Sequence, residues 1–156
     1  MGWRVVEIRE RADADLEVCV ELLRDVHEVG GYPVNWPVDP RAWLTPVDGL
    51  GCWVAVVYGR VVGHVALTAE GPDGAQVERL FVDPTATRAG IGRQLLEHCV
   101  TTAAGLGRKL SLEVVDKPGA AAIALYRRAG WLETGRTPID WGGDQASHLL
   151  HFEPPN

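Results

Sequence analysis

Residues 87–93, Thr-Arg-Ala-Gly-Ile-Gly-Arg, form the segment of this sequence that is best suited to binding an anion. The segment lies between a predicted strand and a predicted amphipathic helix, so its backbone N–H groups should point from a helix amino terminus into open space. Gly90 and Gly92 lack the Cβ atoms that would block a phosphate, and Arg88 or Arg93 can add charged contacts. A tight strand-to-helix turn would use the same glycines, so the pattern alone supports an anion site and a purely structural turn about equally.

The spacing of these glycines excludes two nucleotide-binding motifs. A dinucleotide-binding fingerprint needs a third Gly or Ala three residues after Gly92, where Leu95 stands. A P-loop needs Gly-Lys-Ser or Gly-Lys-Thr, and the lysines of this chain, Lys109 and Lys117, lie far from the segment. An anion bound here must therefore belong to another class of ligand.

Two motifs extend the pattern on either side of residues 87–93. The first is Glu-Arg-Leu-Phe-Val-Asp-Pro at residues 78–84, continued by Arg-Ala-Gly-Ile-Gly-Arg-Gln-Leu-Leu at residues 88–96. The second is Ala-Ile-Ala-Leu-Tyr-Arg-Arg-Ala-Gly-Trp at residues 122–131. In this order they resemble the central motif and the later helix of the GNAT superfamily of acyl-CoA-dependent N-acetyltransferases. The resemblance covers roughly residues 53–135.

The resemblance implies a site for acetyl-CoA or another acyl-CoA. Its pantetheine arm would run beside residues 80–82 like an added strand, because the family's two central strands, here residues 76–82 and 110–115, splay apart and leave N–H groups unpaired. One of these N–H groups would polarise the thioester carbonyl. The implied cofactor-binding residues, with the pyrophosphate on the loop, are Leu80, Phe81, Val82, Thr87, Arg88, Ala89, Gly90, Ile91, Gly92 and Arg93.

Glu78 is the candidate base. Acyl transfer to an amine needs one, because an ammonium ion has no lone pair with which to attack. Alternation along the strand, counted back from Val82, places Leu80, Glu78 and Gln76 on one face, so we expect Glu78 to point toward the cofactor edge. Some members of the family use a carboxylate on this strand. His64 or ordered water are alternative bases, and a solvated carboxylate without a catalytic role is nearly as well supported for Glu78.

Tyr126 is the candidate acid. It matches the tyrosine of the family's later helix, and its hydroxyl would protonate the departing thiolate. The alternative is a core tyrosine that packs one helical turn from Ile123. No covalent enzyme intermediate is expected, because Ser111 lacks a nucleophile-elbow sequence and the cysteines lie outside any recognisable electropositive helix start.

Residues 32–51 are rich in proline and irregular, and the family builds its acceptor wall in this part of the chain. Tyr32 and Trp36 are the candidate acceptor-binding residues, and aromatic side chains of this kind suit an amine with apolar or cationic character. The same aromatics, together with Trp43, are equally well explained as anchors that hold the loop in place.

Periodicity predicts the elements that must position these residues. Strands are expected at 3–9, 53–58, 61–69, 76–82, 110–115, 131–137 and 147–153, and the turn between the second and third is expected at Gly59-Arg60. Helices are expected from an Asp13 cap to Gly30-Gly31, at 91–105 and at 120–129, with a short turn near 41–44 and a loop at 140–144. This order predicts an α/β fold with a mixed, twisted sheet and helices on both faces, in a single domain spanning residues 1–156.

Composition limits the remaining possibilities. The formal charge is −6 and no basic cluster is present, which argues against nucleic-acid binding. The three cysteines have no CxxC spacing, so we expect buried thiols and neither disulfides nor a metal site. Apolar runs are too short for a membrane span, and charges in the first seven residues argue against a signal peptide, so a cytoplasmic location is expected.

The sequence therefore predicts an N-acetyltransferase that moves an acetyl group from acetyl-CoA to a primary amine of a small molecule or peptide, by direct attack in a ternary complex. The alternative is an acyl-CoA-binding regulatory module without catalysis, against which the presence of both Glu78 and Tyr126 argues. A homodimer is possible, since dimers are common in the family.

Overall fold

The computed structural model of the protein describes residues 5–117, 121–141 and 148–155. In these ranges, no helix combines the length and apolar character needed to cross a membrane. The predicted features at 118–120 and 142–147 lie outside the described residues.

The strands are β1 (Val6–Glu10), β2 (Gly49–Val57), β3 (Arg60–Glu70), β4 (Gly74–Val82), β5 (Lys109–Val115), β6 (Leu132–Pro138) and β7 (His148–Glu153). The α-helices are α1 (Leu16–Gly30), α2 (Pro40–Trp43), α3 (Ile91–Gly105) and α4 (Ala121–Arg128), with 3₁₀ helices at Asp13–Asp15 and Pro84–Ala89.

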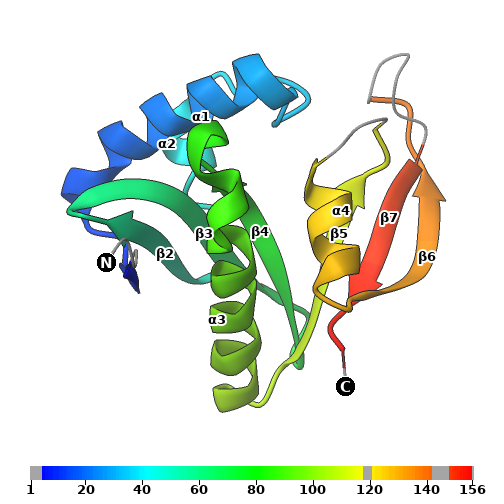
Figure 1. Ribbon diagram of the computed structural model, residues 1–156. Helices are drawn as coiled ribbons and strands as arrows, with labels where there is room; N and C mark the ends of the chain where they lie inside the picture. The colour runs from blue at the N-terminus through cyan, green and yellow to red at the C-terminus, as the bar shows by residue number, and fades with distance from the viewer. Residues whose placement is uncertain (1–4, 118–120, 142–147, 156) are drawn as a thin grey trace.

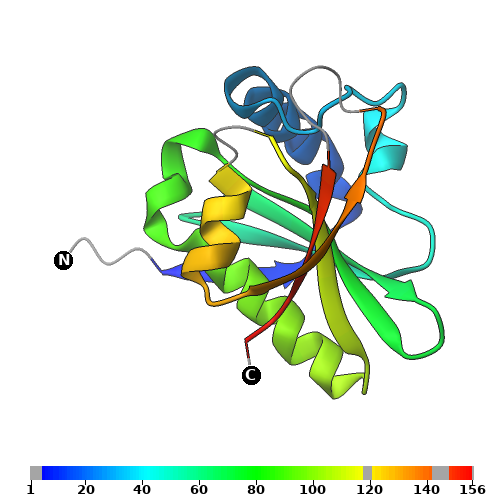
Figure 2. The ribbon, with the colours of Figure 1, turned by 90° about the vertical axis from the view of Figure 1, so that its right-hand side faces the viewer.

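The seven strands form one mixed sheet in the order β1-β2-β3-β4-β5-β7-β6 (Figures 1 and 2). Only β4 and β5 are parallel, and every other neighbouring pair is antiparallel. The predicted α/β class and mixed sheet are confirmed. Periodicity did not predict that β7 lies between β5 and β6, because strand order depends on contacts between distant segments.

Helices cover both faces of the sheet, as predicted. Strand β2 shows how, because its successive side chains enter two different apolar clusters. Trp53, Ala55 and Val57 belong to the cluster that includes α3, whereas Val54 and Val56 belong to the cluster that includes α1. Burial on both faces explains why this strand is an uninterrupted apolar run in the sequence.

Two local predictions need correction. The β2–β3 turn is Tyr58-Gly59, one residue earlier than predicted, and both residues have positive φ (50° and 75°), as a two-residue turn of type I′ requires. Asp13 does not cap α1, because a short 3₁₀ helix precedes α1 and shifts its start to Leu16. At the start of this 3₁₀ helix it is the Asp15 carboxylate that accepts a backbone hydrogen bond, from the Ala12 N–H at 2.7 Å.

Strands β4 and β5 separate partway along their length, which confirms the predicted splay. They pair from Gly74 opposite Lys109 to Val77 opposite Leu112. Beyond that point β5 continues along β7 and β4 continues along β3 as far as Val82, and the two strands diverge in Figure 1. Each strand thus has one edge without a strand partner beyond the separation.

Candidate functional site

A β-bulge lies in β4 just beyond the point where β5 separates. His64 pairs with Phe81 and Ala66 pairs with Glu78, so two residues of β4 lie opposite one residue of β3. Arg79, inside the bulge, has a φ of 54°, a left-handed conformation that L-residues rarely adopt. The bulge places the Glu78 and Phe81 side chains on the same face of the sheet.

The bulge also overturns the predicted alternation of this strand. Leu80 and Val82 pack with the apolar cluster that includes α3, whereas Phe81 packs with the cluster that includes α1. Glu78 and Leu80 therefore lie on opposite faces, and the prediction that Leu80, Glu78 and Gln76 share one face is wrong. One extra residue in a strand moves every later side chain to the other face.

The loop after β4 leads directly into the start of α3. The Asp83 carboxylate accepts the Thr85 N–H at 2.9 Å and the Thr85 hydroxyl at 2.8 Å, and it pairs with Arg60. Burial alone would raise the pKa of Asp83, but these bonds outweigh burial and hold the pKa below its usual range. Asp83 thus anchors the 3₁₀ helix that leads to Gly90.

Helix α3 begins with N–H groups that have no partner within the helix. Its first backbone hydrogen bond runs from Gln94 N–H to the Gly90 carbonyl at 3.1 Å, so the N–H groups of residues 91–93 precede it. This is the anion-binding geometry that the sequence predicts. The Arg93 side chain is exposed and pairs with Glu97 at 3.4 Å, and the side chains of Thr87, Arg88 and Ala89 lie outside the described part of the chain.

The two glycines of the loop have different roles. Gly90 has a φ of 76°, and a Cβ added there would meet no atom within 4 Å, so its face is open. A Cβ added at Gly92 would lie 2.8 Å from Leu125 Cδ2. Gly92 therefore permits close packing of α3 against α4, whereas Gly90 remains the glycine suited to a ligand's approach.

Glu78 occupies the first position of β4 beyond its pairing with β5. Its side chain is 31% exposed and its carboxylate lies 3.1 Å from Arg79 Nη1. Burial raises the pKa of Glu78, the Arg79 charge opposes that rise, and the carboxylates of Glu113 and Glu70 add to it. A carboxylate with a raised pKa at the mouth of the splay is well suited to accepting a proton.

His64 is unsuited to the role of base that the sequence left open to it. Its side chain is completely buried and stacks on Phe81, with ring centroids 5.0 Å apart. Nδ1 lies 2.9 Å from the Arg79 carbonyl oxygen and Nε2 lies 2.9 Å from Arg11 Nη1, so both nitrogens are already engaged. Burial lowers the pKa of His64 to about 4.

Tyr126 lies on α4 with its ring packed against Trp131 and Phe152. The residue is 6% exposed, and its hydroxyl has no hydrogen-bond partner among the described residues. Burial raises the pKa of Tyr126, and charges on Tyr32 and Glu78 would raise it further. The phenol therefore stays protonated at neutral pH.

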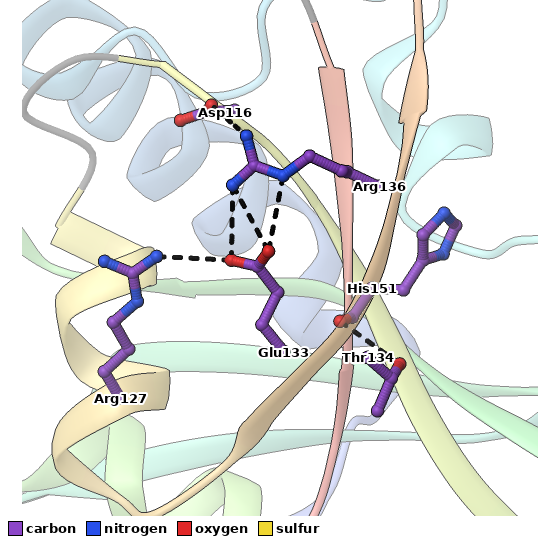
Figure 3. A network of polar contacts seen from close by, with 6 residues as sticks. All are labelled: Asp116, Arg127, Glu133, Thr134, Arg136 and His151. Atoms are coloured by element: carbon purple, nitrogen blue, oxygen red, sulfur yellow. Dashed lines mark hydrogen bonds and ion pairs between the residues drawn. The ribbon is translucent and has the colours of Figure 1, made fainter.

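A polar network connects α4 with the strands beyond the splay (Figure 3). Arg127 of α4 lies 3.3 Å from Glu133 of β6, and Arg136 of β6 lies 3.2 Å from Glu133 and 3.8 Å from Asp116, which follows β5. These ion pairs are largely exposed and contribute little to stability.

Among the aromatic candidates, Tyr32 packs against Trp43 and Phe81, and Trp36 packs elsewhere. The ring centroid of Tyr32 lies 6.0 Å from that of Trp43 and 6.5 Å from that of Phe81. Burial raises the pKa of Tyr32, and charges on Arg79 and Glu78 also act on it. Trp36 packs instead against α1, 5.3 Å from the His27 ring.

Two arginines of the site were not predicted. The Arg79 guanidinium carbon lies 4.2 Å from the centroid of the Trp43 ring, and Arg79 Nε donates to the Trp43 carbonyl at 2.9 Å. Arg11 contacts His64. The adjacent charged residues Glu78-Arg79 interrupt an apolar strand, which is a signal for a bulge, but no local signal in the sequence connects Arg11 with residue 64.

No group of three or more potential ligand side chains among the described residues is arranged to hold a metal ion. A shallow hollow of about 310 Å³ lies at the opposite end of β4 from the bulge, lined by Glu70, Asp73, Gly74, Lys109, Ser111 and Glu153.

A splayed mixed sheet beside a helix with free amino-terminal N–H groups defines the class of acyl-CoA-binding acyltransferases. The acetyltransferase (GNAT) family model matches residues 16–131. The chain belongs to this family, as its motifs predict.

Relatives support the same class. The chain is 40% identical over 125 residues to an IAA acetyltransferase of Azospirillum brasilense, covering 79% of this chain and 80% of that protein. It is 36% identical over 89 residues to the peptidyl-lysine N-acetyltransferase YjaB of Salmonella typhimurium, covering 56% of this chain and 54% of that protein. A GNAT acetyltransferase from Elizabethkingia anophelis, solved with acetyl-CoA bound, shares the fold with a TM-score of 0.72 at 15% identity, over 97% of this chain and 98% of that chain. The family match and these relatives agree on the class of GNAT acetyltransferases.

Proposed function

We propose that this protein transfers an acetyl group from acetyl-CoA to a primary amine, by direct attack of the amine while both substrates are bound. The observation that carries the proposal is the position of Glu78. A half-buried carboxylate with a raised pKa lies where β4 leaves β5, one residue before the bulge. The opposite face of the same strand carries Leu80 and Val82 and leads to the open start of α3.

The chain's residues fit acetyl-CoA, which when bound supplies an electrophilic thioester carbonyl. The N–H groups of residues 91–93 and the open face of Gly90 suit the pyrophosphate, and the free edge of β4 at residues 80–82 suits the amide-bearing arm. In this arrangement the cofactor arm lies along the free edge of β4 and the Glu78 carboxylate lies beside that edge on the α1 face, so the amine and the thioester would meet at the splay.

Three groups of the chain would act on the reaction. Glu78 accepts a proton from the ammonium form of the acceptor, so that the nitrogen gains a free electron pair for attack. A backbone N–H of residues 80–82 stabilises the charge that develops on the carbonyl oxygen. Tyr126 donates its proton to the sulfur as the carbon–sulfur bond breaks. The attacking nitrogen then loses its second proton to give the neutral amide, and solvent carries a proton back to the phenolate.

The acceptor would bind on the α1 face of the sheet beside Glu78. Tyr32 and Trp43 provide aromatic surface there, next to the Arg79 guanidinium. We assign Tyr32 to the acceptor wall. Trp36 packs against His27 and Arg24 of α1, so in this proposal it holds the loop in place and does not form the acceptor wall.

The acceptor class is tested by measuring CoA release with a panel of amines. The panel includes lysine-containing peptides, because a relative is named for that substrate, together with free amino acids, polyamines and aromatic amines. Release with at least one amine, and acetylation of that amine by mass, is the expected result. Acetyl-CoA binding without release for every amine would support the non-catalytic module instead.

Acetyl-CoA at one hundred times its dissociation constant is expected to stabilise the fold by about 2.7 kcal/mol. Gly90→Val should abolish this stabilisation, because the new side chain would fill the open face in front of residues 91–93. Thermal unfolding with and without acetyl-CoA measures both effects.

Gly107→Val is the matched control. Gly107 follows the other end of α3, has a φ of 67° and has no atom within 4 Å of an added Cβ, so the substitution adds comparable backbone strain away from the loop. Both variants should lose similar stability without ligand, but only Gly90→Val should lose the shift with acetyl-CoA. An undiminished shift in Gly90→Val would place the pyrophosphate elsewhere.

A further inference from the structure

The peptide bond between Arg79 and Leu80 is held by a side chain of the neighbouring strand. His64 Nδ1 lies 2.9 Å from the Arg79 carbonyl oxygen, and Arg11 Nη1 lies 2.9 Å from His64 Nε2. A guanidinium can only donate hydrogen bonds, so Nε2 must accept, and the single proton of the neutral ring is on Nδ1. His64 therefore donates to the Arg79 carbonyl.

This hydrogen bond determines where the next N–H group points. In a planar trans peptide the carbonyl and the following N–H point in opposite directions. The Arg79 carbonyl faces His64 on β3, so the Leu80 N–H faces away from β3, toward the side from which β5 has separated. We propose that His64 is a positioning residue that aims the Leu80 N–H into the splay as the donor to the thioester carbonyl. The inference rests on the proposed acetyl transfer.

The bulge needs such support because Arg79 adopts a left-handed conformation that is unfavourable for a residue with a Cβ. Without the imidazole, the peptide could rotate and turn the Leu80 N–H out of the splay. The stacking of His64 on Phe81 holds the ring in the orientation that the hydrogen bond requires.

The same network ties the bulge to the acceptor side of the site. Arg11 Nη1 donates to the Leu44 carbonyl at 2.7 Å, and Arg79 Nε donates to the Trp43 carbonyl at 2.9 Å. Both carbonyls lie at the carboxyl end of α2, where helix carbonyls lack partners within the helix. A chain of contacts therefore connects α2, Arg11, His64 and the bulge.

His64→Phe tests the proposal, because phenylalanine keeps a ring beside Phe81 and removes both hydrogen bonds. We expect kcat to fall by about 10- to 100-fold, somewhat less than the loss of a whole oxyanion donor. The dissociation constant for CoA, which has no acyl carbonyl, should stay within about twofold of wild type. His64→Asn, whose amide can again donate to the Arg79 carbonyl, should recover much of kcat although it leaves a cavity.

Leu67→Ala is the control for general destabilisation, since Leu67 is completely buried in the same strand but packs in the cluster that includes α3, away from His64 and Phe81. It should lower the unfolding temperature and leave kcat near wild type. The proposal is overturned if His64→Phe retains wild-type kcat, or if His64→Asn is no better than His64→Phe.

A second measurement needs no substrate. Nitrogen NMR of the wild-type protein should show His64 as the Nδ1–H tautomer with no titration between about pH 5 and 8. An Nε2–H tautomer, or protonation in that range, would overturn the inference whether or not an acceptor is known. Failure of the proposed acetyl transfer can be told apart from failure of this inference. In the first case the wild-type protein would release no CoA with any amine, while His64 would still be the Nδ1–H tautomer.

Discussion

Glu78→Gln is expected to lower kcat by about 10²- to 10⁴-fold at neutral pH, the usual contribution of a positioned general base. In the proposed mechanism the Glu78 carboxylate accepts the proton, and burial raises its pKa above the ordinary value. Wild-type turnover should therefore decline as pH falls through this raised pKa, because the protonated carboxyl cannot take a proton from the ammonium. Steady-state rates across pH, with an acceptor found in the amine panel, measure the effect.

The variant should show a different pH dependence. Without Glu78 the reaction depends on amine that is already neutral, and this fraction rises about tenfold per pH unit below the pKa of the amine. The deficit of Glu78→Gln should therefore be largest near neutral pH and shrink toward alkaline pH. Wild-type turnover of the variant at every pH would assign the proton transfer to water, since both nitrogens of His64 are engaged.

Glu113→Gln is the matched control for charge. Glu113 lies across the splay on β5, accepts a hydrogen bond from Gln76 at 3.1 Å, and raises the pKa of Glu78 through its charge. Removing this charge should move the acidic limb of the profile to lower pH and leave the plateau of kcat unchanged. If the plateau of kcat is lost in Glu113→Gln, the assignment of Glu78 as the base is wrong and Glu113 takes that role.

Tyr126→Phe is expected to reduce kcat by about 10²- to 10⁴-fold while the fold keeps its stability. The ring and its packing against Trp131 and Phe152 are retained, and the hydroxyl has no protein partner within the described ranges. Binding of acetyl-CoA should persist in a thermal-shift titration. The loss should therefore appear in turnover, which identifies a proton donor to the leaving thiolate.

Tyr58→Phe is the control, because Tyr58 is 80% exposed in the β2–β3 turn, far along the chain from α4. It should leave both kcat and the unfolding temperature unchanged. If Tyr126→Phe also turns over at the wild-type rate, the thiolate leaves without help and Tyr126 is a packing residue.

Much of this fold could be predicted because the signals are local. Apolar periodicity and glycine positions identified the order of strands and helices. The short helical turn predicted near residues 41–44 corresponds to α2, which spans Pro40–Trp43, one residue earlier. The loop from Asp83 to Gly90 was predicted for the same reason, since Asp83-Pro84 ends a strand and Gly90 starts a helix within a few residues. These features depend on backbone propensities that neighbouring residues determine.

The arrangement of the catalytic candidates depended on contacts between distant segments. The bulge at Arg79 reversed the expected face of Leu80 relative to Glu78, and it exists because β3 and β4 pair with unequal numbers of residues. His64 could be listed as a base from its residue type alone. His64 becomes a neutral hydrogen-bond donor only because it is buried between Phe81 and Arg11. Arg11 lies 53 residues before His64 in the sequence. Residue types and periodicity thus determined the class of fold and the candidate anion-binding loop, whereas the tertiary structure decided the partners of His64 and the side-chain directions, because these depend on pairing register and burial.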